Sequence, residues 1–497
     1  MTEMDRFLNK DWRLALLLLG YSALVLTMMS PDSPLHGDWN HWDSGCFFMS
    51  GKAVMNGLQP YVDFADSKGP LLWLWWGIGY LISPRSYTGM WLLGIICYTI
   101  ILFYHYHTAR VLLKDNMRSL LVTLLMVFPY FFYWFHYEVR AEDFCTIFVS
   151  VSIYYMFHLL YGEETEHYTV RRYGLVFGGC FMALILIKYN IAAMQGTMIL
   201  AALWYFYREQ GKFREPVVWM LAGAVVVAFP FIIWLVAVGS LGACIQEYFI
   251  NTFETLKYTN VPTPYWKELL LVFEYPERLS LLLFIIFGGW LLSKQLSHNR
   301  YVPLFVGVFF FCMSTKHYLD HYYCACSVVV FFLILASVNH AVRKISKWHL
   351  TVTLTVIVGW LIMENTRENA FLHQDVLSST DIKRTVFEDV SNVLSETPKP
   401  RIMYLYAGEW GYGIRAEALP AGKYWLYQYG STPKMEQEHI ELLKSGRADY
   451  VIVIYEDRCL EKGLTPEVIK SYGYETCYTR KHLEGIDHPT TTIYKRR

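Results

Sequence analysis

Apolar runs long enough to cross a lipid bilayer recur along most of this 497-residue chain. A bilayer core of roughly 30 Å needs about 20 apolar residues in a helix, and about eleven runs approach that length. Hydrophobic residues make up 54% of the chain and charged residues 17%, a balance that is atypical of a soluble domain. We therefore predict a polytopic α-helical membrane protein. The predicted spans are Trp12–Met29, Thr88–Tyr106, Ser119–Phe135, Phe144–Tyr161, Tyr173–Ile187, Ile191–Tyr207, Val217–Val238, Leu279–Leu292, Val302–Met313, Tyr322–Val338 and Leu350–Met363.

The Lys and Arg residues between the predicted spans indicate an orientation, because cytoplasmic loops are enriched in both. Every second loop is basic: Arg6 and Lys10, Arg110–Arg118, Arg171 and Arg172, Arg208–Arg214, Lys294 and Arg300, and Arg343–Lys347. The first span lacks a following cleavage site and the chain lacks an Asn-x-Ser/Thr sequon, which favours a retained anchor in a bacterial inner membrane. The other loops and the tail are then predicted to be periplasmic.

After about Arg367 the sequence becomes polar, and strand-like runs alternate with helix-like ones. The strand-like runs are Arg401–Ala407, Tyr450–Tyr455 and Thr490–Lys495, and the helix-like runs are Glu436–Lys444 and Pro466–Ser471. This alternation predicts a small α/β domain over residues 365–497, following a membrane domain over 1–364 whose first outer loop covers 30–87. We expect the domain to be a lid or a docking platform. Its Cys459 and Cys477 are predicted to be either a disulfide or two free thiols.

The first outer loop contains an unusual group of charged and turn-forming residues. Asp43 follows directly after His41 and Trp42, and the stretch from Gly57 to Pro70 reads GLQPYVDFADSKGP. Charged side chains at a bilayer edge are costly to hold, so they indicate a functional site. The Trp-rich run Leu71–Ile82 that follows is too short to span and is predicted to be an interfacial helix.

This arrangement resembles the lipid-dependent integral-membrane glycosyltransferases of the C superfold. The features that carry the resemblance are the early Asp43, the Pro-Tyr-x-Asp to Lys-Gly-Pro stretch, and the Arg-x-Glu of Arg140 and Glu142. The similarity is greatest to the dolichyl-phosphate-mannose protein mannosyltransferases and the bacterial aminoarabinose transferases, and it covers residues 1–364. It implies one inverting displacement at the anomeric carbon of a sugar carried on polyprenyl phosphate. The partners would be that donor, membrane lipids, and a glycan, lipid or protein acceptor.

The resemblance assigns roles to residues of the first loop. Asp43 is the candidate general base for the acceptor hydroxyl, and the alternative is a helix cap near Ser44. Lys68 is the candidate contact of the donor phosphate, and the alternative is a plain salt bridge to Asp63 or Asp66. Tyr61 is a candidate sugar-stacking ring, together with Trp39 and Trp42.

Residues of later loops complete the candidate site. Glu142 fits the second acidic motif of the family and is the candidate for organising charge in the active site, with a surface ion pair as the alternative. The fork-shaped guanidinium of Arg140 suits either an acid or a phosphate. Further candidate substrate contacts are Lys188, Lys316, His317 and Tyr318. The segment Gly239–Glu277 is long enough to cover the acceptor site.

No cofactor is assigned by the sequence, but a divalent ion is an open alternative. Carboxylates such as Asp63, Asp66, Glu138, Glu142 and Asp143 suit a hard cation, with Asp66 and Glu142 as the main candidates. Ser67, however, stands where the aminoarabinose transferases have a glutamate directly before the lysine. This departure leaves a metal requirement open.

Other classes of protein are also compatible with the sequence. The main alternative is a transporter or flippase of lipid-linked saccharide, because charged residues in membranes also mark transport pathways. Against it, the helices show no clear repeat and the acids cluster in loops. A non-catalytic assembly protein is a third alternative. Net charge is zero, so no nucleic-acid partner is expected.

Overall fold

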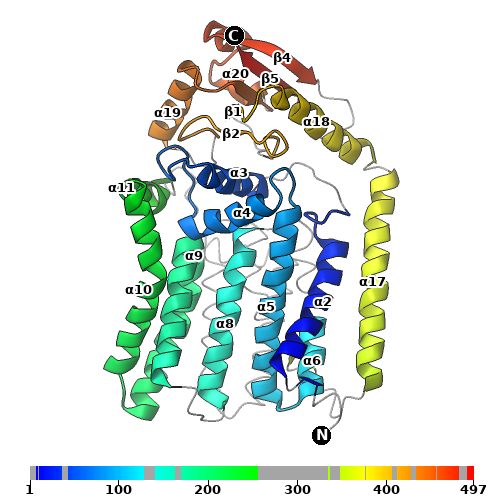
Figure 1. The fold of residues 1–497 in the computed structure, drawn as a ribbon, viewed down its shortest axis with the longest axis vertical. Helices are drawn as coiled ribbons and strands as arrows, with labels where there is room; N and C mark the ends of the chain where they lie inside the picture. The colour runs from blue at the N-terminus through cyan, green and yellow to red at the C-terminus, as the bar shows by residue number, and fades with distance from the viewer. Residues whose placement is uncertain are drawn as a thin grey trace. The chain divides into compact units, whose positions relative to one another are not determined.

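The computed structural model describes residues 7–8, 10–35, 43–127, 140–162, 169–255, 334–335, 338, 347–374, 377–405, 411–426, 432–454, 456–480 and 490–497 (Figure 1). The chain forms two compact units. Unit 1 comprises Met1–Ser30, Gly94–Phe231 and Pro262–Ile362, and unit 2 comprises Pro31–Leu93, Ile232–Val261 and Met363–Arg497. Each unit is built from segments that are far apart in the sequence.

Unit 1 is formed largely by long apolar helices. They are α2 (Asp11–Met29), α5 (Thr88–Leu113), α6 (Asn116–Leu125), α8 (Ala141–Tyr161), α9 (Val170–Gln210) and α10 (Arg214–Ala237), with the ends of α5 and α10 belonging to unit 2. Among the described residues, five helices are long and apolar enough to cross a membrane: α2, α5, α8, the Val170–Ala192 part of α9, and α10. These helices lie at five of the predicted spans and fit a polytopic membrane protein.

The total of eleven spans stays a prediction. Leu279–Leu292, Val302–Met313 and most of Tyr322–Val338 lie outside the described residues. The run at Leu350–Met363 lies within the helix α17 (Lys347–Gln374). The division into domains at residue 364 likewise stays a prediction.

Helix α9 is a hairpin of two helical halves. The backbone of Lys188 leaves the helical region, with φ −157° and ψ 96°. The rings of Tyr173 and Phe206, which lie in opposite halves, have centroids only 6.1 Å apart. The chain therefore reverses at Lys188, and this confirms the tight turn predicted between two spans. Both halves pack with α8 in one buried cluster that includes Tyr155 and Phe177.

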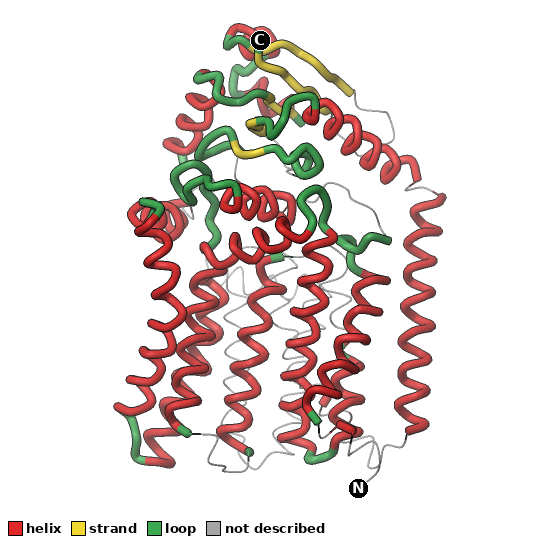
Figure 2. The backbone as a smooth tube through the Cα atoms, viewed as in Figure 1, coloured by secondary structure: helices red, strands yellow, loops and turns green. Residues whose placement is uncertain are grey.

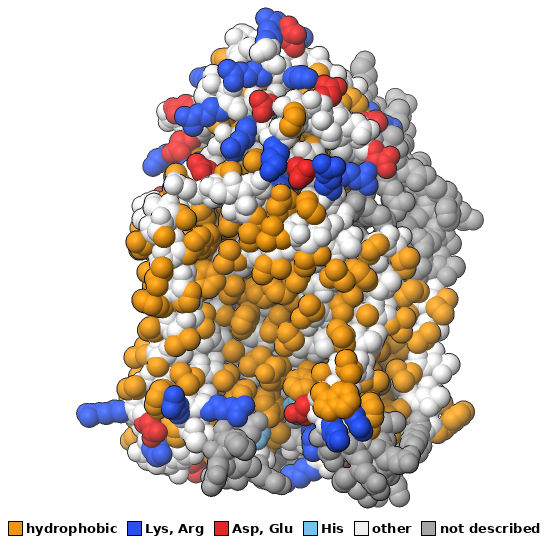
Figure 3. Space-filling view, viewed as in Figure 1, with side chains coloured by type: hydrophobic (Ala, Val, Ile, Leu, Met, Phe, Trp, Pro, Cys, Tyr) orange, Lys and Arg blue, Asp and Glu red, His pale blue; other side chains and the backbone are white. Residues whose placement is uncertain are grey.

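Small residues allow close contact between α9 and α10. A Cβ atom added to Gly178 would lie 1.8 Å from the carbonyl oxygen of Met220. Such close approach is common between membrane helices, where dispersion contacts replace hydrophobic burial. The other side of α10 is open: Val218, Leu221 and Val226 are between 60% and 68% exposed. Hydrophobic side chains cover the visible surface of these long helices in Figure 3, as expected of a lipid-facing surface.

Unit 2 contains two short helices of the first loop, α3 (Asp43–Met55) and α4 (Pro70–Ile82). Pro70 begins α4, where its missing N–H has no cost and its fixed φ suits a helix. The two helices cross where a Cβ atom on Gly51 would lie 2.5 Å from the Gly77 nitrogen. The helix predicted at Leu71–Ile82 is confirmed, while its interfacial depth stays a prediction.

The five described strands all fall within residues 401–496 of unit 2 (Figure 2). They are β1 (Arg401–Leu405), β2 (Leu419–Pro420), β3 (Tyr450–Val453), β4 (Tyr474–Arg480) and β5 (Thr491–Arg496). The strand order is β2-β1-β3-β5-β4; β1 is parallel to β2 and β3, and the pairs β3–β5 and β4–β5 are antiparallel. Helices α18 (Leu377–Ser395), α19 (Pro433–Lys444), α20 (Glu456–Glu461) and α21 (Pro466–Ser471) accompany the sheet.

All three predicted strands and both predicted helices of the tail are present in the structure. Strands β2 and β4 and helices α18 and α20 were not predicted. Cys459 is buried with its Sγ donating to the Leu405 carbonyl, and Cys477 lies on β4. Both are free thiols, so the disulfide alternative is wrong for this structure.

Lys52 of α3 is completely buried, and its ammonium nitrogen donates to the Gly413 carbonyl at 2.9 Å. Burial lowers the pKa of Lys52 from 10.5 to about 7; the charge of Glu417 opposes this shift and that of Lys399 adds to it. Between these two pH values the unfolded chain binds a proton that the folded chain does not, so stability rises with pH in this window.

We therefore expect the melting temperature of the wild type to rise, relative to that of Lys52→Met, as the pH increases from 7 toward 10.5. The rise corresponds to about 1.4 kcal/mol per pH unit at most. Thermal unfolding in detergent at several pH values measures it, with the exposed Lys434→Met as control. Parallel curves for wild type and Lys52→Met would contradict a buried, neutral Lys52.

Candidate active site

Asp43 is the first residue of α3, in the turn where the helix dipole favours a negative charge. Cys46 lies three residues later, on the same face of the helix. Burial raises the pKa of the Cys46 thiol well above its ordinary value; the charges of Asp66 and Asp43 raise it further, and that of Lys68 lowers it. Two carboxylates and one ammonium of the predicted site therefore lie within electrostatic reach of one buried thiol.

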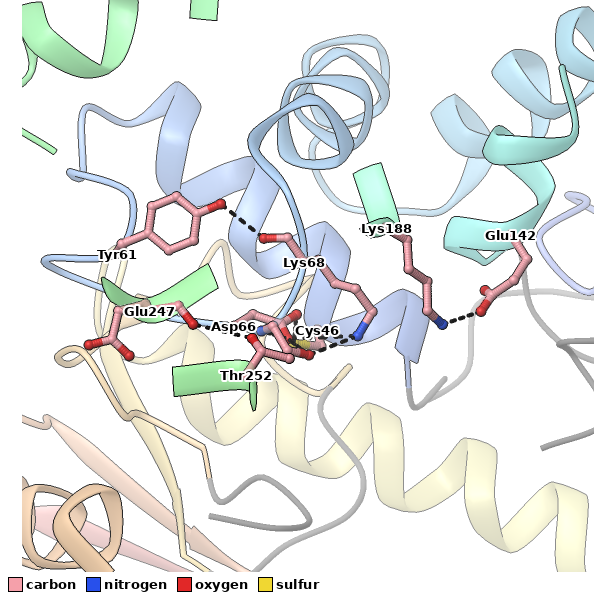
Figure 4. A network of polar contacts seen from close by, with 9 residues as sticks. Cys46, Tyr61, Asp66, Lys68, Glu142, Lys188, Glu247 and Thr252 are labelled. Carbon is pink, nitrogen blue, oxygen red and sulfur yellow. Dashed lines mark hydrogen bonds and ion pairs between the residues drawn. The ribbon is translucent and has the colours of Figure 1, made fainter. Parts of the chain in front are cut away.

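Asp66 and Lys68 form the ionic part of this group. The Lys68 Nζ lies 3.9 Å from Asp66 Oδ1 and donates to Ser67 Oγ at 3.2 Å. Their side chains are 16% and 7% exposed, for Lys68 and Asp66 respectively. Cys46 Sγ contacts Asp66 Oδ2 at 3.8 Å, and Lys68 also lies 5.5 Å from the Phe47 ring centroid. Figure 4 shows Cys46, Asp66 and Lys68 converging on this point.

Tyr61 holds the loop that carries these residues. It has a φ of +63°, which is uncommon for a residue with a side chain, and its hydroxyl donates to the Lys68 carbonyl at 2.9 Å. Its ring is completely buried and has centroids 4.4 Å from Trp73 and 6.5 Å from Tyr248. The buried ring thus supports the loop from inside, and the stacking of Tyr61 on a sugar stays a prediction.

Asp63 has a local role in the structure. Its Oδ2 accepts the Gln59 N–H at 2.7 Å, and the hydrogen bond is exposed to solvent. Of the two acids considered as salt-bridge partners of Lys68, the described ion pair involves Asp66. Asp63 thus closes the turn before Phe64, an arrangement typical of aspartate in loops.

A second ionic pair lies in unit 1. Lys188, at the turn of the α9 hairpin, forms an ion pair with Glu142 in the first turn of α8. The two side chains are 11% and 2% exposed, respectively. The neighbouring Asp143 accepts the Arg140 N–H at 2.9 Å and so caps the same helix. The structure thus brings together Lys188 and Glu142, which are distant in sequence.

Removing one member of this buried pair leaves the other charge without compensation. We expect Lys188→Met to lower the melting temperature by roughly 5 °C, since breaking a buried pair is strongly destabilising. The double variant Lys188→Met with Glu142→Leu should recover most of the loss, because it removes both charges. Thermal unfolding in detergent tests both, and an unchanged melting temperature in the single variant would contradict the pairing.

The described residues contain no group of three or more His, Cys, Asp or Glu side chains placed to hold a metal ion. Asp66 and Glu142, the main candidate ligands, each have a lysine ammonium as ionic partner. An ammonium beside a carboxylate competes with a divalent cation for the same oxygens. The donor sets of Asp66 and Glu142 therefore do not fit a resident metal.

Several predicted residues lie outside the part of the chain that the structure describes: Trp39, Trp42, Glu138, Lys316, His317 and Tyr318. Their roles stay predictions. The site also includes residues that the motifs did not indicate, notably Cys46 and, farther along the chain, Lys423. The i, i+3 spacing of Cys46 from Asp43 is a weak sequence signal that Cys46 lies beside the site. Nothing in the local sequence around Lys423 indicates a partner.

Residues 67–234 match the model of the dolichyl-phosphate-mannose-protein mannosyltransferase family. The matched range includes Lys68, Arg140, Glu142 and Lys188. A search of curated protein sequences gave no match.

The fold is similar to solved structures of ArnT from Cupriavidus metallidurans. With the undecaprenyl-phosphate-bound structure the TM-score is 0.60 at 13% identity, covering 97% of each chain. With the apo structure it is 0.61 at 12% identity, covering 96% of this chain and 97% of that one. The resemblance to the membrane glycosyltransferases of the mannosyltransferase and ArnT group is therefore confirmed.

Proposed function

We propose that this protein is an inverting glycosyltransferase that moves a sugar from a polyprenyl-phosphate carrier to an acceptor hydroxyl. The observation that carries the proposal is the grouping of Asp43, Asp66 and Lys68 around Cys46 in the first loop. The family match beginning at residue 67 and the ArnT fold support it. The ArnT of the comparison binds undecaprenyl phosphate, which makes a polyprenyl phosphate the natural donor carrier to test.

In the proposed reaction, the acceptor oxygen attacks the anomeric carbon of the donor sugar. The bond from that carbon to the phosphate oxygen breaks, and the electron pair leaves with polyprenyl phosphate. Asp43, at the start of α3, takes the proton of the acceptor hydroxyl, because a positioned carboxylate can act as a general base. Attack opposite the leaving group gives inversion.

Lys68 has the role of stabilising the charge that develops on the leaving phosphate. Its ammonium is largely buried and is held by Ser67 and Asp66, so it needs little rearrangement to meet an anion. Asp66 keeps that ammonium oriented when no donor is bound. Arg140 and Glu142, which lie in unit 1, keep as part of the proposal the roles that the resemblance assigns to them.

The site is proposed to face the periplasm of a bacterial cell, as the distribution of Lys and Arg predicts. The tail over residues 365–497 is proposed to contribute to acceptor handling. The sugar and the acceptor are determined by the shape of the pocket, so each needs a direct assay.

A transfer assay with the purified protein tests the proposal. Radiolabelled sugars on polyprenyl phosphate are supplied as a panel, with envelope extract as the acceptor source. We expect label from one donor to move to an acceptor or to water. Labelled donor that is bound but never cleaved, and that reaches the opposite leaflet of a vesicle, would instead support the flippase alternative.

A further inference from the structure

The π-helix η2 (Ile245–Asn251) contains a buried carboxylate with three partners. The Glu247 side chain is 4% exposed and forms an ion pair with the Lys423 ammonium. The Tyr424 hydroxyl and the Asn251 amide each donate to Glu247 Oε2 at 2.9 Å. Turns of π-helix are rare and occur frequently at functional sites. Three side chains of unit 2 therefore hold the Glu247 carboxylate in place.

Glu247 and its partners are connected to the loop that carries Lys68. The Lys423 carbonyl accepts the N–H of Ala65 at 2.9 Å, and Ala65 directly precedes Asp66. On the other side of the loop, Tyr248 lies beside Tyr61, with ring planes 27° apart. Tyr61 in turn donates to the Lys68 carbonyl. Residues at and beside Glu247 therefore contact the segment 61–68 at Tyr61 and at Ala65, and Figure 4 shows Tyr61, Asp66, Lys68 and Glu247 in one view.

We propose that Glu247 is a positioning residue for Asp66 and Lys68, acting through Lys423 on one side and through Tyr248 and Tyr61 on the other. The proposal rests on the proposed function, in which Lys68 binds the donor phosphate. A buried ion pair adds little stability relative to apolar packing, so its value here is in geometry. A displacement of about 1 Å at a site of this kind can lower catalysis about a hundredfold.

The Tyr424 hydroxyl stays a donor to Glu247 at alkaline pH. Burial, followed by the charge of Glu247, raises the pKa of this hydroxyl well above its ordinary value. Lys423 is the cationic contact among the three described partners, and its side chain is 29% exposed. Glu247 contacts one lysine and two neutral donors. Glu247→Gln is therefore the informative change, because it keeps the shape of the side chain and removes its charge.

Hydrogen exchange of the full-length protein tests the positioning without any need for activity. We expect amides in the segment 61–68 to exchange about tenfold faster in Glu247→Gln, since hydrogen bonds to charged groups are among the strongest. Tyr424→Phe, which removes one hydrogen bond and keeps the ion pair, should give a smaller increase in the same peptides. The control is Glu475→Gln, which removes an exposed ion pair with Arg497 elsewhere in unit 2. Exchange that is unchanged in Glu247→Gln, or equally raised in the control, would overturn the proposal.

Kinetics then show whether the positioning acts through Lys68. We expect Glu247→Gln to lower kcat/KM for the donor about tenfold, and to have no further effect in a Lys68→Ala background. Equal effects in both backgrounds would mean a purely structural role and would overturn the proposal. If the wild type transfers no sugar, the proposed function fails, while the exchange experiment still decides the role of Glu247.

Discussion

Asp43→Asn is expected to lower the rate of sugar transfer at least about a hundredfold, the usual contribution of a general base. The amide has the shape of the carboxylate but cannot accept the proton of the acceptor hydroxyl. Because Asp43 lies at the start of α3, where asparagine is tolerated, the variant should remain folded. Single-turnover transfer with purified protein in detergent, at saturating donor, measures the chemical step directly.

The control for this change is Asp389→Asn in α18. Asp389 is 41% exposed and accepts hydrogen bonds from Tyr478 and Arg480, so the variant makes the same chemical change outside the site. Near-normal transfer is expected there. Near-normal transfer in Asp43→Asn would instead assign Asp43 to helix capping alone, and the base would have to be another carboxylate.

Lys68→Ala is expected to reduce kcat/KM for the donor by roughly tenfold to a hundredfold, the range for losing a hydrogen bond to a charged group. The loss should fall mainly on use of the donor, because the ammonium meets the phosphate and not the acceptor. Lys68→Arg should recover part of the activity, since it keeps the positive charge. Initial rates over a range of donor concentrations separate these effects.

Lys495→Ala is the matched control for the lysine change. Lys495 lies on β5 and is paired with Glu396 at 2.8 Å, at a position 41% exposed. Its removal should leave the dependence on donor concentration unchanged. The same unchanged dependence in Lys68→Ala, with a normal rate, would show that Lys68 only forms a structural salt bridge with Asp66.

The membrane helices were predictable because their apolar runs are long and continuous. The run Trp12–Met29 became α2 with nearly the same bounds, and the interruption at Lys188 became the turn of α9. A charged residue in an otherwise apolar stretch is costly in a bilayer, so it marks a turn or a site. That signal located the turn of the hairpin, whereas the ion pair of Lys188 with Glu142 was not predicted.

In the tail, a helix or strand was predicted correctly where its own residues carry the hydrophobic pattern. Strand β3 is a short apolar run, whereas β2 is two residues long and exists only through its pairing with β1. Helix α18 did have a signal, because Val386, Val390 and Leu394 recur at helical spacing and are completely buried. The polar residues between them obscured it.

The candidate site was predictable in its residue types but not in its connections. The motif placed Asp66 and Lys68 two residues apart, and they do form an ion pair. Nothing local indicated that Tyr61 would be buried, because burial depends on Trp73 and on Tyr248 of a distant segment. The link from Glu247 to Lys423 likewise joins residues whose sequence contexts are ordinary.

The fate of the oxygen atom that joins the sugar to the phosphate tests the central claim most directly. A donor carrying heavy oxygen at that position is incubated with the protein and an acceptor, and the products are analysed by mass spectrometry and NMR. Displacement at the anomeric carbon predicts heavy oxygen in the released polyprenyl phosphate and an inverted anomeric configuration in the product. Heavy oxygen retained on the sugar, or donor recovered intact, would contradict the account.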